Sequence, residues 1–360
     1  MEHWIMAAAS VFFVLGGTDY ILHNRFGLGA EFEKGILAAG RLLLCMAGFI
    51  VLAPVIAALL SPVISPIFRS VGWDPSVFAG LVFANDSGGS VLALEMADDP
   101  QMGRYSGLII GAMMGTTVMF IIPLTIANTH GTKREAAIYG LLAGIITIPP
   151  GCLVGGVCAG FPLKQVAWNT VPVVIIALVL VIALIFFRQG VVAALSRLGE
   201  WILILSVIGL MIAGFQDLNG IELIPGMGKL DEVYSIVGNI CVFLAGIFPL
   251  LAVIRRILTC PLLALGRILR VNEPSLTGFL LAFANGIPVC SMLEEMDDRG
   301  RMINVAFLVS ASCLLGDHLA YTSQADAAMC VPVLVGKLVS GVLAVLLSLV
   351  LAPKVLPQKT

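Results

Sequence analysis

The chain has 360 residues, of which 59% are apolar and 12% are charged. A soluble domain carries roughly a quarter charged residues, so this composition excludes a water-soluble globule. A net charge of -2, with no dense run of Lys or Arg, also excludes a strongly basic nucleic-acid-binding protein. The chain is therefore predicted to have the lipid bilayer, and no nucleic acid, as its partner.

Eleven apolar stretches are candidates for membrane segments, because a helix needs about 20 apolar residues to cross the hydrocarbon core. In chain order they cover residues 4–22, 36–60, 75–97, 104–127, 136–159, 168–187, 200–216, 233–254, 274–296, 302–324 and 327–352. This pattern predicts an all-α polytopic membrane protein.

Two of these segments, 75–97 and 274–296, are interrupted in the middle. The first contains FANDSGGS at 83–90 and the second contains FANGIP at 283–288. Gly, Pro and polar residues break helices, and irregular backbone occurs in membranes only where protein or a water-filled cavity surrounds it. We expect broken or re-entrant helices near both, and the interruption alone leaves crossing and re-entry open.

The two interrupted segments are related by an offset of 200 residues, at which eight of 32 positions are identical between 83–114 and 283–314. The predicted organisation is a first transmembrane repeat over 1–165, a linker helix over 166–190 and a second repeat over 191–360. If the interrupted segments re-enter, 14 of the 18 loop Lys and Arg residues share one side, whereas eleven crossings place nine on each side. The positive-inside rule favours re-entry, which makes the second repeat inverted.

Few ionisable residues lie inside the apolar segments. A charge at a helix centre costs about 2.5 to 3.5 kcal/mol on insertion scales, so each one needs a partner or a function. Where a half-helix ends and another begins, unpaired carbonyl and N–H groups are also available to a small polar solute. The predicted substrate-binding residues lie at the two breaks and just after the second: Asn85, Asp86, Ser87, Asn285, Gly286, Asp317 and His318.

Each of these residues also has a structural interpretation. The two Asn side chains can cap the broken backbone, and the Asp317–His318 pair can neutralise a buried Lys337 or Arg41. The small-xxx-small spacings of the glycines are expected to pack helices closely. Four acidic residues near the ends of the interrupted segments are expected on a solvated face or in internal salt bridges: Glu95, Asp98, Glu295 and Asp298.

The sequence carries no pattern typical of an enzyme. A G-x-G-D motif at Asp317 lacks its first Gly, there is no G-x-S-x-G, and the eight Cys are scattered without metal-ligand spacing. No catalytic residue, metal or cofactor is predicted. Inverted repeats with broken helices are typical of secondary transporters. A cation channel is a less favoured alternative, since no carboxylate ring or filter-like run is present, and an intramembrane enzyme is another.

Around the two breaks and Gly316-Asp317-His318-Leu319, the sequence resembles the ethanolamine permease family (EutH) of bacterial ethanolamine utilisation systems. The similarity covers nearly the whole chain and includes the stretches 24–27, 32–35, 74–76, 106–115, 142–149, 224–227 and 335–338. The resemblance implies a multi-pass permease of the bacterial inner (cytoplasmic) membrane that imports ethanolamine or a similar small cationic amino alcohol.

Three positions depart from the family pattern. The family usually has N-D-M-G-G, G-P-T and N-N-I-P where this chain has Ser87, Thr116 and Gly286. These changes leave the exact substrate open, and another small polar solute is the alternative. Proton or ion coupling is also open, as is a homo-oligomer, because Gly-rich faces serve packing within one chain equally well.

Overall fold

The computed structural model describes residues 2–355, except for the side chains of 2–3, 258–269 and 354. The last residues of the predicted second repeat, 356–360, and the side chain of Cys260 thus lie outside the described part. Within 2–355 the chain is helical and has no strand, which confirms the predicted all-α class.

The elements of the first half include several short π-helical stretches, labelled η1 to η4. In chain order they are α1 (Glu2–Ile21), α2 (Gly29–Leu42), η1 (Leu43–Ala47), α3 (Gly48–Ser70), α4 (Ser76–Val82), η2 (Asn85–Gly89), α5 (Ser90–Met96), α6 (Pro100–Arg104), η3 (Tyr105–Gly115), η4 (Thr117–Ile121), α7 (Ile122–Ala127) and α8 (Gly131–Cys158).

The second half follows α9 (Leu163–Phe186), which occupies most of the range expected for the linker. Its elements are α10 (Arg188–Asn219), α11 (Leu230–Leu269), α12 (Glu273–Ala282), α13 (Gly286–Ser291), α14 (Asp298–Ala311), α15 (Asp317–Ala325), η5 (Ala327–Met329, a 3-10 turn) and α16 (Cys330–Val355).

Eight helical stretches of the described residues are long and apolar enough to cross a membrane, which confirms the multi-pass prediction. They are Trp4–Ile21, Gly29–Ser70, Pro100–Ala127, Gly131–Cys158, Leu163–Phe186, Arg188–Asn219, Leu230–Ile257 and Ala327–Pro353. The interrupted segments 75–97 and 274–296 are not among these eight.

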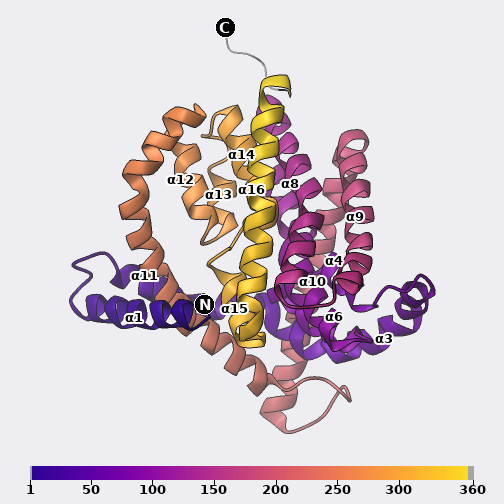
Figure 1. Cartoon of the computed structure of the whole chain (residues 1–360). Helices are drawn as coiled ribbons and strands as arrows, with labels where there is room; N and C mark the ends of the chain where they lie inside the picture. The colour runs from indigo at the N-terminus through magenta and orange to yellow at the C-terminus, as the bar shows by residue number, and fades with distance from the viewer. Residues whose placement is uncertain (1, 356–360) are drawn as a thin grey trace.

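Helices α8 and α16 pack along each other and form the axis around which the other elements are arranged, with α14 against both (Figure 1). Glycines permit the close approach. A Cβ atom added at Gly151 of α8 would lie 2.7 Å from the carbonyl oxygen of Gly336 on α16. The expected packing role of the small-residue spacings is thus seen at this pair.

The two ends of the first interrupted segment lie close together in space. Asp74 precedes α4, and its carboxylate accepts hydrogen bonds from the backbone N–H of Ser76 (2.9 Å), Asp98 (3.2 Å) and Asp99 (3.0 Å). Since Asp98 and Asp99 follow α5, α4 and α5 form a helical hairpin whose base is closed by one carboxylate.

The second interrupted segment is closed in the same way by Asp297, which follows α13. Its carboxylate accepts from the backbone N–H of Asn272 and from the hydroxyl of Ser275, both at 2.9 Å. The Asn272 side chain in turn donates to the carbonyl of Glu295 at 2.9 Å. The segment therefore forms a second hairpin.

The bases of the two hairpins lie at opposite ends of α8, whose 28 residues span about 42 Å. Past the C-terminal end of α8, Gln165 donates to Asp99 at the first base (3.3 Å). At its N-terminal end, Lys133 and the backbone N–H of His130 donate to the Glu294 carboxylate, each at 2.8 Å. The hydrogen bond from Lys133 lowers the pKa of Glu294 to about 2, so this second-base contact is ionic at physiological pH.

The segment 302–324, expected as one continuous crossing, is broken. Helix α14 ends at Ala311, Cys313 adopts a left-handed backbone conformation (φ 53°), and α15 begins at Asp317. The intervening chain pairs with the second hairpin: the N–H groups of Cys313 and Leu315 donate to the carbonyls of Ala282 (3.0 Å) and Phe283 (2.8 Å). The tertiary pairing thus replaces the helical hydrogen bonds that the apolar sequence predicts.

The hairpin geometry predicts the labelling of single cysteines by a membrane-impermeant thiol reagent. In a background without the native Cys, Ser70→Cys and Gln101→Cys flank the first hairpin and should be labelled from the same side of the membrane. Thr132→Cys and Lys164→Cys flank the crossing helix α8 and serve as the control pair, which should be labelled from opposite sides. Labelling of residues 70 and 101 from opposite sides would contradict a hairpin.

Candidate functional site

A cavity of about 410 Å³ lies where the two hairpin tips meet the break after α14. Its wall contains six of the seven predicted site residues: Asp86, Ser87, Asn285, Gly286, Asp317 and His318. The structure thus brings together, at one cavity, residues that are more than 200 positions apart in the chain.

The first tip is irregular because its sequence cannot continue the α4 helix. Phe83 and Ala84 are extended, and Gly88 has a φ of +87°, a conformation that L side chains rarely adopt. A Cβ at Gly88 would also collide with the ring of Phe49. The N–H groups of Ser87 and Gly89 both donate to the carbonyl of Ala84 (3.2 and 3.1 Å). This turn holds Asp86 at the cavity wall, where the Ser87 hydroxyl donates to its carboxylate at 3.2 Å.

At the second tip, Asn285 has the capping role considered for it and also contacts Asp317. Its side-chain oxygen caps α13 by accepting from the N–H of Ile287 at 2.8 Å, and its amide nitrogen donates to the Asp317 carboxylate at 3.2 Å. The cap fixes the amide, and the amide orients the carboxylate. Asn285 therefore couples the second tip to the start of α15.

Asn85, the seventh predicted residue, lies behind the cavity wall. It is fully buried, and its amide nitrogen donates to the backbone carbonyl of His318 at 3.4 Å. Its side-chain oxygen has no hydrogen-bond partner among the described residues. Asn85 thus links the first tip to α15, as Asn285 does for the second tip.

The ion pair considered between Asp317 and Lys337 is not formed in the structure, where Lys337 contacts His318 instead. Lys337 of α16 is fully buried, but its ammonium contacts Nδ1 of His318 (2.6 Å) and the carbonyl of Ser312 (2.7 Å). Among the described residues no carboxylate lies within ion-pair distance of it. Asp317 is therefore not used to neutralise Lys337.

Part of the cavity wall was not predicted. Helix α2 contributes Lys34 and Arg41, η1 contributes Cys45, and the junction of η3 and η4 contributes Thr116. The position of Arg41 at the cavity could have been predicted, because it is an ionisable residue inside an apolar segment. Thr116 follows a long π-helical stretch, and such stretches are frequent at functional sites.

The acidic residues expected outside the site behave as structural groups where the structure shows their partners. Asp98 pairs with Arg69 (2.7 Å to Nε), and Asp298 pairs with the buried Arg301 (2.5 Å). Asp19, which is not one of these four residues but an ionisable group inside the apolar segment 4–22, accepts hydrogen bonds from three backbone N–H groups after α1. None of these three carboxylates lines the cavity.

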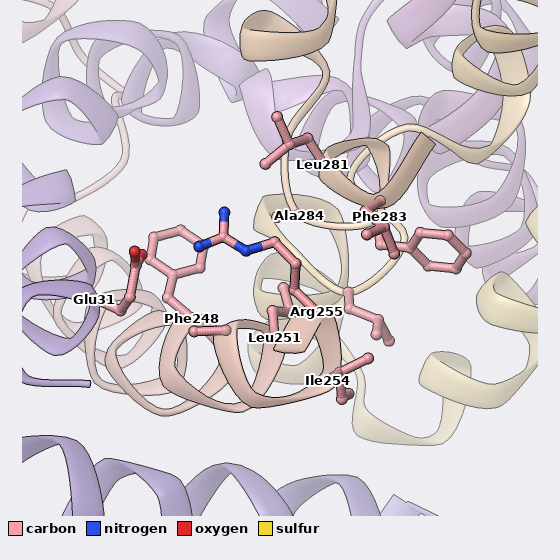
Figure 2. A pocket seen from close by; sticks show the side chains of 11 residues that line it. Glu31, Phe248, Leu251, Ile254, Arg255, Leu281, Phe283 and Ala284 are labelled. Carbon is pink, nitrogen blue, oxygen red and sulfur yellow. The ribbon is translucent and has the colours of Figure 1, made fainter. Parts of the chain in front are cut away.

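A second cavity, of about 200 Å³, adjoins the first on the side of α11. Figure 2 shows the Arg255 side chain reaching across it between Phe248 and Leu281, with Glu31 on one side and Ala284 of the second tip on the other. Phe248 lines both cavities. Apart from Glu31 and Arg255 the wall of this cavity is apolar.

Comparison with known proteins gives one consistent result. The family model described as "Ethanolamine utilisation protein, EutH" matches residues 1–351. The probable ethanolamine permease EutH of Listeria monocytogenes is 42% identical over 97% of this chain and 93% of its own length. The probable ethanolamine permease EutH of Escherichia coli is 37% identical over 91% of this chain and 86% of its own length, and an uncharacterised Bacillus subtilis protein, YxeR, is 37% identical over 95% and 91%.

No solved structure matches the chain. The family match and the relatives cover nearly all of the sequence, including both hairpin tips and the α14–α15 break. The chain belongs to the EutH family of ethanolamine utilisation proteins.

Proposed function

We propose that this chain is a secondary transporter that carries ethanolamine, or a similar small cationic amino alcohol, across the bacterial inner membrane. The observation that carries the proposal is the cavity where the tips of two hairpins from opposite ends of α8 meet. Two carboxylates line it, Asp86 of the first tip and Asp317 at the start of α15, which Asn285 of the second tip contacts. Relatives named as probable ethanolamine permeases support the same role.

The charges of the cavity suit a cationic solute. Ethanolamine carries an ammonium group at neutral pH, and a carboxylate hydrogen-bonded to it in a low-dielectric site contributes about 1.5 to 3 kcal/mol. Asp86 comes from the first tip, and Asp317 is aimed by Asn285 of the second tip. One solute can therefore engage both hairpins at once, with Arg41 balancing part of the remaining negative charge.

The arrangement also suits alternating access. Each hairpin separates the cavity from one end of α8, and broken helices that meet at a central site are typical of carriers built from inverted repeats. In this proposal the predicted repeats 1–165 and 191–360 move relative to each other. The solute then meets one side of the membrane at a time.

Removal of the carboxylate charges tests the site. In proteoliposomes, Asp86→Asn and Asp317→Asn should each lower the initial rate of labelled ethanolamine uptake at low substrate by about tenfold or more, since a lost charge-assisted bond corresponds to at least that factor. Asp231→Asn, at an exposed position of α11, is the matched control and should keep the wild-type rate. Full uptake by both site variants would refute the charge-balancing role.

The chemical class of the solute is tested by competition. Unlabelled 2-aminoalcohols should inhibit ethanolamine uptake, whereas ethylene glycol, which replaces the ammonium by a second hydroxyl, should not inhibit at a hundredfold excess. The reason is that a neutral solute gains no charge pairing with Asp86 and Asp317. Inhibition by ethylene glycol as strong as that by an aminoalcohol would instead indicate a carrier for another small polar solute.

A further inference from the structure

Lys337 restricts the protonation of the His318 ring. An ammonium group has three donors and no acceptor, and that of Lys337 lies 2.6 Å from Nδ1 of His318 while donating to the Ser312 carbonyl at 2.7 Å. A contact this short requires a lone pair on Nδ1. The ring nitrogen that faces Lys337 is therefore the unprotonated one.

Thr116 leads to the same tautomer from the other side of the ring. Its single hydroxyl hydrogen is donated to the carbonyl of Gly111 at 3.0 Å, so the hydroxyl offers a lone pair to Nε2 of His318 at 3.4 Å. Nε2 then carries the hydrogen. Two neighbours on separate elements thus require a neutral imidazole with its N–H on Nε2.

The backbone that carries this ring is also held in place. His318 is buried, and its carbonyl accepts from the hydroxyl of Thr322 (2.7 Å) and from the amide of Asn85 (3.4 Å). His318 nevertheless lines the 410 Å³ cavity beside Asp317. At 3.4 Å the bond from Nε2 to Thr116 is long, so an acceptor in the cavity can compete for this hydrogen.

We propose that Lys337 is a positioning residue, which holds His318 as a fixed hydrogen-bond donor for the hydroxyl oxygen of the substrate. The two carboxylates only accept and suit the ammonium end, whereas Nε2–H of His318 donates and suits the oxygen end. This inference rests on the proposed function and deepens it, because it explains how an amino alcohol is distinguished from a plain alkylamine.

The tautomer can be measured in the unmodified protein. The chain has four His, so ¹⁵N-histidine labelling in bilayers, with His318→Gln to assign the signal, resolves both ring nitrogens. At pH 7, Nδ1 of His318 should show the shift of an unprotonated nitrogen and Nε2 that of a protonated one. A ring protonated on Nδ1, alone or together with Nε2, would overturn the proposal.

Selectivity supplies the functional test. Wild-type protein should take up ethanolamine at least about tenfold more efficiently than ethylamine, which has the ammonium but no hydroxyl. Lys337→Gln keeps an N–H donor for Nδ1 and should preserve this ratio, whereas Lys337→Met should reduce it to below about threefold. A structural defect alone would slow both amines equally and leave the ratio unchanged.

The positioning role would be refuted if Lys337→Met left the ratio of ethanolamine to ethylamine uptake unchanged, or if Lys337→Met and Lys337→Gln lowered this ratio equally. Neither result would contradict the proposed transport of ethanolamine. A wild-type protein that takes up neither amine would refute the proposed function itself. If the Met variant does not fold, as judged by size-exclusion chromatography, the ¹⁵N measurement on the wild-type protein decides the matter.

Discussion

A single constraint organises this structure: inside a membrane, backbone groups released from a helix must find partners within the protein, because no bulk water reaches them. The break after α14 meets it by donating from Cys313 and Leu315 to the carbonyls of Ala282 and Phe283 at the second tip. The first tip meets it locally, on the carbonyl of Ala84. The candidate site lies where these irregular segments meet. The same region therefore supplies both the partners of the released backbone groups and the polar groups of the cavity.

The sequence predicted a helix break where the broken segment itself contains residues that disfavour a helix. It did not predict a break that depends on contacts with distant residues. The tips at 83–90 and 283–288 contain Gly, Pro and polar residues, and both breaks were predicted. The break before Asp317 was not, because the residues just before Gly316 are apolar and only the pairing with the second tip makes a non-helical conformation favourable. Likewise, the contribution of α2 to the cavity depends on its packing against α11, which periodicity does not encode.

Two basic side chains are fully buried in the described part of the chain, and they have different structural roles. Arg301 pairs with Asp298 and donates to the carbonyls of Leu293 and Met296, so it holds the base of the second hairpin together. Lys337 instead contacts the imidazole of His318 and the carbonyl of Ser312. Ser87, Thr116 and Gly286, the three positions at which a departure from the family pattern is expected, all line the cavity. The charges of the hairpin bases, by contrast, maintain the fold.

The glycines around the first hairpin have a mechanical consequence. A Cβ at Gly80 would collide with the carbonyl of Ser106, and one at Gly115 with the carbonyl of Phe83, so α4 and η3 touch backbone against backbone. Contacts of this kind leave no side-chain layer that could slide or re-pack, and packed interiors deform little. The first hairpin and η3 therefore form one stiff block, in which Asp86 and Thr116 keep a constant separation. In the proposed transport cycle, the cavity opens by displacement of this block as a whole, and the tip does not fold back on its own.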